Sequence, residues 1–477
     1  MLLVLVVMPV VLGALALLVP SPRARAWLVP AGAVIHAAVT AYVVILAPSP
    51  LFDRWLTLGP FGRLMLAIVS GQYLVCSFYV PAYLSSRSDR PNRMFCACLI
   101  AFEGTMSLVT ISHHLGLMWV GIETSTLLAA PLIYFHRNPR SLEATWKYLQ
   151  IGSVGIAFAL LGSFFLASSA LHSDAGIQTS LLFEDLVRDA PHLSKPWLHA
   201  ALVILLVGYG TKIGLAPMHT WKPDVYGESP GIVGALLAGG LTTCAFCALL
   251  RFVQIANAAG DGDLLRSLLL AFGLISMAVA AAFMIRQRDF KRMLAYSSVE
   301  HMGIIAIGLG LGGLGTYGAL LHMLNNSFGK GVLFMAAGNL HRVYDSKLAA
   351  DVTGAIHRVP ASSALFLVGL FAITGSPPFG LFLSELAILR AAFASGQYWV
   401  AALVVALLAV VFIGMSAVVT RVVQGPVPAE PNRAHEPWLT IVPAVCCLAI
   451  ILVLGIYVPA WLDSALRDAA AFVEMRS

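Results

Sequence analysis

The residues of this sequence that could do chemistry are ionisable side chains inside long apolar segments. The central candidates are Glu123, Lys212, His322, Lys330 and Glu385. A charge at the middle of a membrane helix costs roughly 3 kcal/mol on insertion scales, so each such side chain needs a partner or water. Inside membranes, residues of this kind mark ion paths and proton relays. We therefore expect this chain to move protons between side chains.

Lys212 lies in a stretch, residues 208–230, that reads GYGTKIGLAPMHTWKPDVYGESP. Pro217 follows the lysine and has no N–H, so the carbonyl of Ile213 loses its helical partner. Membrane transporters build ion sites at mid-depth from a charge beside a broken helix. A helix end whose lysine reaches toward the membrane surface is the plainer alternative.

A second broken helix is predicted just before Glu385. Residues 374–380 read TGSPPFG, and Pro377 and Pro378 interrupt an apolar run there. Lys212 would lie at the carbonyl end of one half-helix, which favours a cation, and Glu385 just past the positive start of another. The two breaks together favour an ion site over the plainer alternative for Lys212.

His322, Asn326 and Lys330 are spaced four residues apart. On a helix they form one polar stripe, with about 12 Å between its ends at ~1.5 Å per residue. Bridged by water, this stripe could relay protons. The alternative is a polar seam that only holds helices together, but a seam does not need a lysine. We favour the relay.

Other ionisable and polar residues are accessory candidates: Glu103, Lys147, Thr242, Glu300, His301 and Asn326. Glu123 and Lys212 would neutralise each other if their helices are adjacent, and a breakable pair could pass a proton. For two of the accessory candidates a structural role is the open alternative. Glu103 would then be a hydrogen-bonded structural acid, and Lys147 a surface partner of Glu143 four residues earlier.

The composition places these residues in a membrane. Of the 477 residues, 59% are hydrophobic and only 11% are charged, against about 25% charged in soluble proteins. Apolar segments of about twenty residues, the length that crosses a bilayer, recur about fourteen times. We expect an all-α polytopic membrane protein with about fourteen transmembrane helices, in which residues 2–19 are a span and not a cleaved signal peptide.

The predicted spans divide the chain into four parts. Residues 1–93 contain helices one to three, and residues 94–252 form a first five-helix repeat. Residues 253–424 form a second five-helix repeat, and residues 425–477 contain helix fourteen. Each repeat has a glutamate in its second helix, Glu123 or Glu300, and a broken fourth helix. An odd number of helices inverts the second copy, and inverted repeats with broken helices place a transport path at their interface.

The basic residues predict an orientation. The connections on one side of the predicted spans carry roughly twice as many Lys and Arg residues as those on the other side, and cytoplasmic loops carry such an excess. We therefore expect both termini on the periplasmic side of a bacterial cytoplasmic membrane.

The sequence carries no motif for a cofactor. We find no GxGxxG after a strand, no P-loop, no cysteine cluster for an iron–sulfur centre and no histidine pair spaced for haem. Cys244 and Cys247 have the spacing of a redox motif but lie in an apolar segment, where small buried side chains are the better interpretation. We expect no catalytic site, no cofactor, no metal and no nucleic-acid partner.

Several motifs together carry a family resemblance. In chain order they are WVGIETSTL, TKIGLAPMHTWKPDVYGESP, DFKRMLAYSSVEHMG, HMLNNSFGKGVLF and SPPFGLFLSELAIL. They resemble the antiporter-like membrane subunits of respiratory complex I, of Mrp-type cation/proton antiporters and of energy-converting hydrogenases. The stretches SLEATWKYLQIGSVGIA and ESPGIVGALLAGGLTTCAF are most similar to the hydrogenase-4 component F branch.

The resemblance implies roles for residues at matching positions. These are a Glu123–Lys212 pair, a central Lys330 with His322, and a terminal Glu385. Two departures stand out. The family often has a lysine or histidine in helix eight where this chain has Thr242, and often a second histidine in helix eleven where it has Asn326.

The leading hypothesis is a proton-translocating, non-redox subunit of a respiratory or hydrogenase-type oxidoreductase complex. Its partners would be other membrane subunits, a redox arm and the lipid bilayer, and Na⁺ remains an alternative to protons. A second hypothesis is a subunit of a cation/proton antiporter or of an ion-coupled bicarbonate-uptake complex. A third is a non-conducting scaffold, which the buried Lys and Glu residues disfavour.

Overall fold

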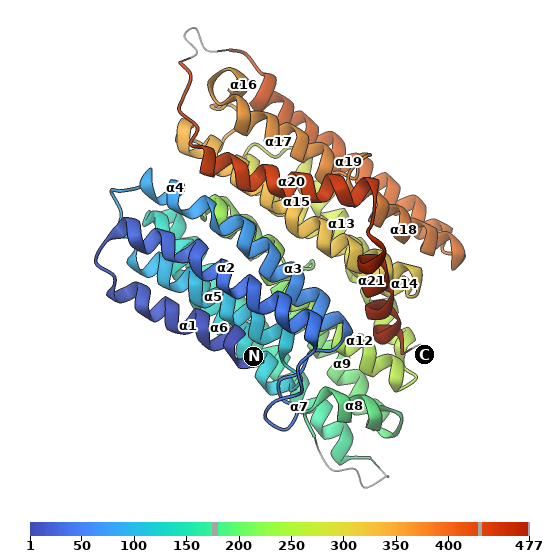
Figure 1. Cartoon of the computed structure of the whole chain (residues 1–477). Coiled ribbons are helices and arrows are strands. Elements are labelled where there is room, and N and C mark those ends of the chain that lie inside the picture. Colours follow the sequence, from blue (N-terminus) through green and yellow to red (C-terminus); the bar gives the residue numbers. More distant parts are fainter. Residues whose placement is uncertain (174–179, 428–431, 476–477) are drawn as a thin grey trace.

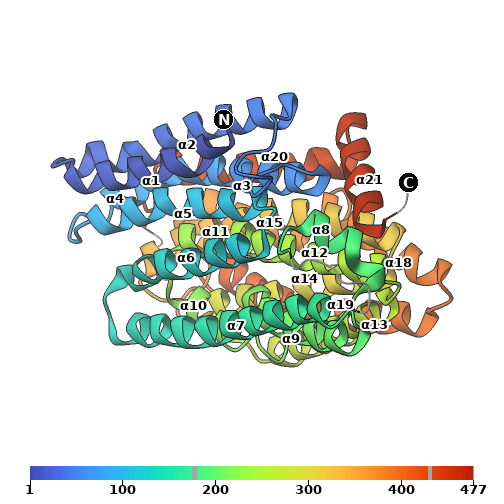
Figure 2. The same ribbon diagram turned by 90° about the horizontal axis from the view of Figure 1, so that it is seen from below.

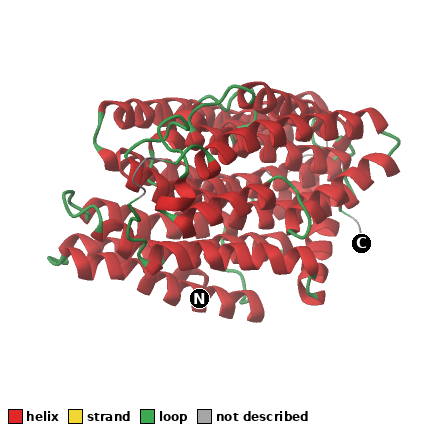
Figure 3. Ribbon diagram, turned by 90° about the horizontal axis from the view of Figure 1, so that it is seen from above, coloured by secondary structure: helices red, strands yellow, loops and turns green. Residues whose placement is uncertain are grey.

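The computed structural model describes residues 1–173, 180–427 and 432–475. Within these residues the chain is all-helical and has no β-strand, only a few isolated bridges between connections (Figure 3). This agrees with the predicted all-α fold.

The described chain forms the following helices. They are α1 (Leu2–Leu18), α2 (Pro22–Leu46), α3 (Pro60–Ser77), α4 (Tyr79–Ser85), α5 (Arg93–Ile111), α6 (Leu115–Ile133), α7 (Pro139–Leu171), α8 (Phe183–Asp189), α9 (Lys195–Ile213), α10 (Trp221–Glu228), α11 (Gly231–Leu236), α12 (Thr242–Ala258), α13 (Gly262–Met284), α14 (Phe290–Leu311), α15 (Leu314–Tyr344), α16 (Ala355–Arg358), α17 (Pro360–Ile373), α18 (Gly380–Ala394), α19 (Tyr398–Gln424), α20 (Trp438–Ile456) and α21 (Ala460–Glu474). Among the described residues, 11 helical segments are long and apolar enough to cross a membrane.

Most of these helices lie alongside one another in one bundle (Figures 1 and 2). Helices α1, α2 and α5 form one side and α17, α19 and α20 another (Figure 1). Apolar side chains such as Val154, Phe158 and Phe164 are exposed on the outside, as expected for a lipid-facing surface. In contrast, the 18-residue apolar window in the segment from α11 to α12 is 100% buried. The bundle therefore has an interior that lipid does not reach.

Both predicted helix breaks are present. Helix α9 ends at Ile213 and α10 begins at Trp221, so Pro217 lies in the interruption. Helix α17 ends at Ile373 and α18 begins at Gly380, with Pro377 and Pro378 between them. Each first half ends at a glycine with positive φ, Gly214 at 78° and Gly375 at 65°, and the proline that follows has no N–H with which to continue the helix.

Helix α7 packs directly on α9 and also contacts α6. A side chain at Gly208 would lie 2.5 Å from the backbone nitrogen of Ala159, so only glycine permits this approach. The close packing decides what surrounds Lys212, which lies one turn further along α9.

Three features were not expected from the sequence. The segment of helix eight contains a π-helical turn, Leu237–Leu241, between α11 and α12. Residues 219–229, which follow the first helix break, are largely helix α10, and the Lys222 side chain on this helix is buried. After α20 the chain forms a further helix, α21, which packs against α3, α12 and α15.

A candidate proton-transfer site in the bundle interior

Lys212 lies at the end of α9 and is 1% exposed. Its Nζ donates hydrogen bonds to the Thr126 hydroxyl on α6, at 2.6 Å, and to the Tyr148 hydroxyl on α7, at 3.0 Å. The amine also lies 4.5 Å from the centre of the Tyr148 ring. The structure therefore surrounds Lys212 with hydroxyl groups and an aromatic face.

Glu123 and Lys212 do not form a direct ion pair in the described structure. Glu123 accepts a hydrogen bond from Ser153 on α7, at 3.2 Å, and its other carboxylate oxygen is buried without a partner among the described residues. Helix α7 contacts both α6 and α9, and it supplies one hydroxyl group to each charged residue, Ser153 to Glu123 and Tyr148 to Lys212. A proton passing between Glu123 and Lys212 would cross these hydroxyl groups.

Lys330 is fully buried at the middle of α15. Its Nζ donates to the Ser297 hydroxyl on α14, at 2.8 Å. Glu300, on the next turn of α14, is also buried. The two residues are not within ion-pair distance among the described contacts, so Lys330 has a hydroxyl partner and a carboxylate nearby.

A hydrogen-bonded line continues from α14 to α18. Nδ1 of His301 and Nε2 of His322 are 2.9 Å apart, and Nδ1 of His322 is 2.9 Å from the Ser384 hydroxyl. Glu385 follows Ser384, and one of its carboxylate oxygens is buried without a partner among the described residues. Asn326, predicted to share the stripe with His322, likewise has a buried amide oxygen without a partner in the described structure.

The same cluster has the donor set of a metal site. His301, His322 and Glu385 each offer a ligand atom, and these atoms lie within 4.8 Å of one another. Two imidazoles and a carboxylate are ligands that Zn²⁺ takes in proteins. The histidines here hydrogen-bond to each other and to Ser384, which is also the arrangement of a proton relay.

The accessory candidates separate into three groups. Lys147 is on the surface, where it pairs with Glu143 at 2.6 Å and with Asp224 on α10 at 2.8 Å. Thr242 donates to the carbonyl of Ala238 in its own helix, at 2.6 Å. Glu300 and His301 lie near Lys330 and His322, as described above.

Glu103 belongs to a separate buried cluster. Its carboxylate lies 3.0 Å from Nδ1 of His36 on α2, and Nε2 of His36 is 2.9 Å from the Ser107 hydroxyl. The sequence reasoning missed His36, whose only signal is a histidine within an apolar segment. Lys222 was also missed, although it stands in the motif that holds Lys212.

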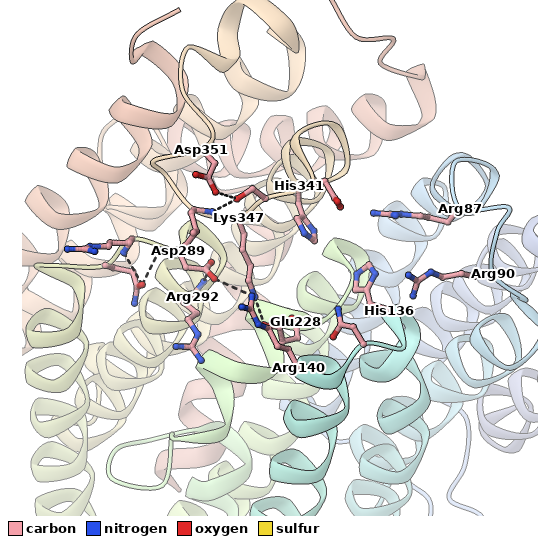
Figure 4. Close-up of a pocket in the computed structure, with 16 residues that line it drawn as sticks. Arg87, Arg90, His136, Arg140, Glu228, Asp289, Arg292, His341, Lys347 and Asp351 are labelled. Atoms are coloured by element: carbon pink, nitrogen blue, oxygen red, sulfur yellow. Dashed lines mark hydrogen bonds and ion pairs between the residues drawn. The ribbon is translucent and has the colours of Figure 1, made fainter. Parts of the chain in front are cut away.

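One end of the bundle carries a charged cavity of about 870 Å³ (Figure 4). The cations that line it are Arg87, Arg90, Arg140, Arg288, Arg292 and Lys347. Lys347 pairs with Glu228 and lies 3.5 Å from Asp289, while Arg87 and Arg90 lie across the cavity near His136 (Figure 4). These cations come from connections that the sequence placed together on the cytoplasmic side, and the structure brings them to the same end.

Comparison with known proteins then decides the family. A family model described as NADH:quinone oxidoreductase/Mrp antiporter, TM, matches residues 112–411. The chain belongs to this family of antiporter-like membrane subunits. The matched range contains Glu123, Lys212, His322, Lys330 and Glu385, and the resemblance predicted from the motifs is confirmed.

Curated relatives and solved structures agree with this assignment. The chain is 35% identical over 356 residues, 74% of each chain, to a "Hydrogenase-4 component F homolog" from Methylacidiphilum infernorum. It is 30% identical over 386 residues, 80% of this chain and 75% of the relative, to "NADH-quinone oxidoreductase subunit N" from Desulforudis audaxviator. A chain of the archaeal membrane-bound sulfane sulfur reductase has the same fold, with a TM-score of 0.89, 20% identity and coverage of 99% and 97%. The protein is an antiporter-like integral membrane subunit of the complex I and hydrogenase type.

Proposed function

We propose that this subunit carries protons across the membrane along its buried ionisable residues, coupled to redox chemistry in partner subunits. The observation that carries the proposal is the line from His301 through His322 to Ser384, beside Glu385. His322 has both ring nitrogens within hydrogen-bond distance of a partner, so it can take a proton at one and release it at the other.

The proposed path has two halves. The first contains Glu123 and Lys212 with the hydroxyls of Ser153, Tyr148 and Thr126. The second starts from Lys330 with Ser297, and leads through the two histidines to Glu385. Thr242 and Asn326 are neighbours of the path, and Glu103 with His36 is a separate cluster.

The path fits a fourteen-span arrangement. Helix α1, helix α15 and the broken pair α17–α18 would be added to the eleven apolar segments. Helices α5 to α12 and α13 to α19 then form two inverted repeats, with breaks at α9–α10 and α17–α18. Inverted repeats with matched broken helices support a transport path at their interface.

The partners follow from the relatives named above. Other membrane subunits and a redox arm would supply the driving reaction, and this chain would contribute no cofactor. The bacterial cytoplasmic membrane is the proposed location, with the cavity lined by Arg87 and Arg140 on the cytoplasmic side, as the excess of basic residues favours. The alternative, a subunit of a multi-subunit cation/proton antiporter or of an ion-coupled bicarbonate-uptake complex, is less favoured, because the named relatives are of the hydrogenase and NADH-quinone type.

Proton conduction can be tested without knowing the electron donor. The complex that contains this chain would be purified from its own membranes, reconstituted in vesicles and driven by a K⁺/valinomycin potential. A pH-sensitive dye inside the vesicles reports proton flux, and ²²Na⁺ uptake reports sodium.

We expect Lys330→Met to lower the proton flux at least roughly tenfold, the scale of losing a proton-transfer group. Lys195→Met is the control, because Lys195 is on the surface and pairs with Asp261 at 2.6 Å. Wild-type flux in assembled Lys330→Met complexes would refute the proposal. If ²²Na⁺ uptake is lost in Lys330→Met and kept in Lys195→Met, the transported ion is sodium and not the proton.

A further inference from the structure

The two halves of the proposed path leave a gap between Lys212 and Lys330. The segment of helix eight, from Gly231 to Ala258, supplies hydroxyl groups but no Lys, His, Asp or Glu. The Thr242 hydroxyl is used by the carbonyl of Ala238, and the Thr243 hydroxyl bonds Gly239 and Ser327. The segment's Arg251 is stacked between the rings of Phe61 and Phe183. Helix eight therefore offers no group that readily takes up and releases a proton.

Lys222 occupies this gap from a different element. It is the second residue of α10, which begins after the break that follows Lys212, and it is fully buried. Gly214, with φ of 78°, makes room for it, because a side chain there would lie 2.3 Å from Cε of Lys222. The break turns the chain back so that this lysine points into the bundle and not toward the membrane surface.

The partners of Lys222 are unusual for a buried cation. Its Nζ donates to the Ser298 hydroxyl on α14, at 3.2 Å. The same nitrogen lies 6.0 Å from the centre of the Trp221 ring and 5.8 Å from the centre of the Tyr226 ring. No carboxylate lies within ion-pair distance of it in the described part of the chain. A buried charge without a paired carboxylate is costly to fold, so its presence points to a task other than holding the fold.

Helix α14 connects Lys222 to the second half of the path. Ser298 bonds Lys222, and the preceding residue, Ser297, bonds Lys330 at 2.8 Å. Consecutive side chains on a helix point about 100° apart, so one serine faces α10 and the other faces α15. Helix α14 contacts both of these helices. A serine hydroxyl can accept and donate at once, as a proton relay requires.

Lys222 is also joined to the first half. Trp221 donates from its ring nitrogen to the carbonyl of Thr211, the residue before Lys212, at 2.8 Å. The ring of Trp221 lies 5.2 Å from that of Tyr148, whose hydroxyl bonds Lys212. Lys212 and Lys222 therefore lie on the two sides of one aromatic pair, at the two ends of the same helix break.

We propose that Lys222 is the proton-carrying residue that links the Lys212 half of the path to Lys330, with Ser298 as its contact on α14. This inference rests on the proposed function, since it assigns one more residue to the same path. One proton moves from the Lys212 side to Lys222, and from Lys222 on to Lys330, with Ser298 and Ser297 as the hydroxyl contacts of the two lysines on α14; only N–H and O–H bonds are exchanged. The lysine absent from helix eight is thereby supplied by α10.

The test uses the reconstituted complex and the dye assay described above, with flux divided by the amount of assembled complex. Lys222→Met keeps the length of the side chain but cannot carry a proton, and we expect it to lower the flux at least roughly tenfold. Ser298→Ala leaves the lysine in place and removes its hydroxyl partner, and we expect a smaller but clear loss. Lys291→Met is the matched control, because Lys291 is equally buried but donates to the backbone carbonyl of Ser229, at 2.6 Å, outside the path.

The outcomes separate the two proposals. Flux lost in Lys330→Met but retained in Lys222→Met overturns the role of Lys222 and leaves the proposed function standing. Flux retained in both overturns the proposed function. If Lys222→Met does not assemble, Ser298→Ala decides: wild-type flux in that variant rejects the link through α14. An equal loss in Lys291→Met per assembled complex would show that any buried lysine is needed for structure, and would also reject the assignment.

Discussion

His301 and His322 lie on neighbouring helices with Nδ1 of the first 2.9 Å from Nε2 of the second. Only one hydrogen can occupy this contact, so the tautomer of one ring determines the tautomer of the other. His322 then presents its Nδ1 to Ser384, 2.9 Å away. A proton arriving at His301 can therefore leave on the side of Ser384 and Glu385.

The first prediction concerns this coupling. His322→Gln keeps polar atoms in the space but cannot take a proton on one side and release it on the other, so proton flux should fall at least roughly tenfold. His36→Gln is the matched variant, because His36 is an equally buried histidine that bonds Ser70 and Ser107 and lies 3.0 Å from Glu103, away from the path. Equal fluxes in the two variants, measured per assembled complex in vesicles, would contradict the role of His322.

The second prediction concerns Glu385, whose unpartnered oxygen lies beyond the second helix break. Glu385→Gln keeps the size and hydrogen bonding but cannot accept and release a proton, so most pumping should be lost. Glu385→Lys should retain part of it, because an amine can still carry a proton. The measurement is proton uptake per electron in vesicles. Near-normal coupling in the Gln variant would mean that Glu385 only caps its half-helix.

The third prediction concerns Lys212. Lys212→Ala should strongly reduce coupled proton pumping while assembly stays mostly intact, because its contacts are two hydroxyl groups and no ion pair among the described residues. Pumping should be compared with Tyr148→Phe, which removes one of these hydroxyls and keeps the ring. We expect the Phe variant to lie between wild type and Lys212→Ala. A fully assembled Lys212→Ala complex that pumps normally would exclude the lysine from the path.

The fourth prediction concerns orientation. A reporter fused after Ser477, which lies outside the described residues, should read as periplasmic, and one inserted in residues 85–92 should read as cytoplasmic. The end of the bundle with the cavity lined by Arg87 and Arg90 is rich in Lys and Arg, and such an excess favours the cytoplasmic side. The opposite result at either point would mean that the count of fourteen spans is wrong.

The fifth prediction concerns helix α21, which lies outside the apolar spans. Hydrogen bonds from Arg467 and Tyr317, each at 2.7 Å, hold the pKa of Asp463 below its usual value. A depressed carboxyl pKa gives stabilisation that is complete above the unfolded value, about 3.9, and is lost as the pH falls through the folded value. Docking of α21 should therefore weaken in acid, measured by hydrogen exchange of residues 460–474.

The matched variant for this prediction is Asp463→Asn. It should show weaker docking of α21 at neutral pH and no further loss from this site in acid. An acid response of equal size in wild type and Asp463→Asn would assign the effect to another group.

The sequence alone determined the membrane class, the family, the two helix breaks and the position of Lys212 and Lys330 within apolar segments. These properties depend on single residues or short segments. A span is recognised by the apolar character of about twenty consecutive residues, and a break by a proline that has no N–H to donate. Neither requires knowledge of which helices are neighbours.

Only the tertiary structure decided which of these residues meet. Glu123 and Lys212, which the sequence paired, bond hydroxyl groups instead of each other: Glu123 accepts from Ser153, and Lys212 donates to Thr126 and Tyr148. His301 and His322 come from different helices, and their contact depends on how each helix is rotated about its axis. Lys222 belongs to a segment that reads as a polar connection, and it is buried because the chain turns inward after the break. Hydropathy is the same for a residue on any face of a helix, so burial and contact at these positions are set by packing between helices.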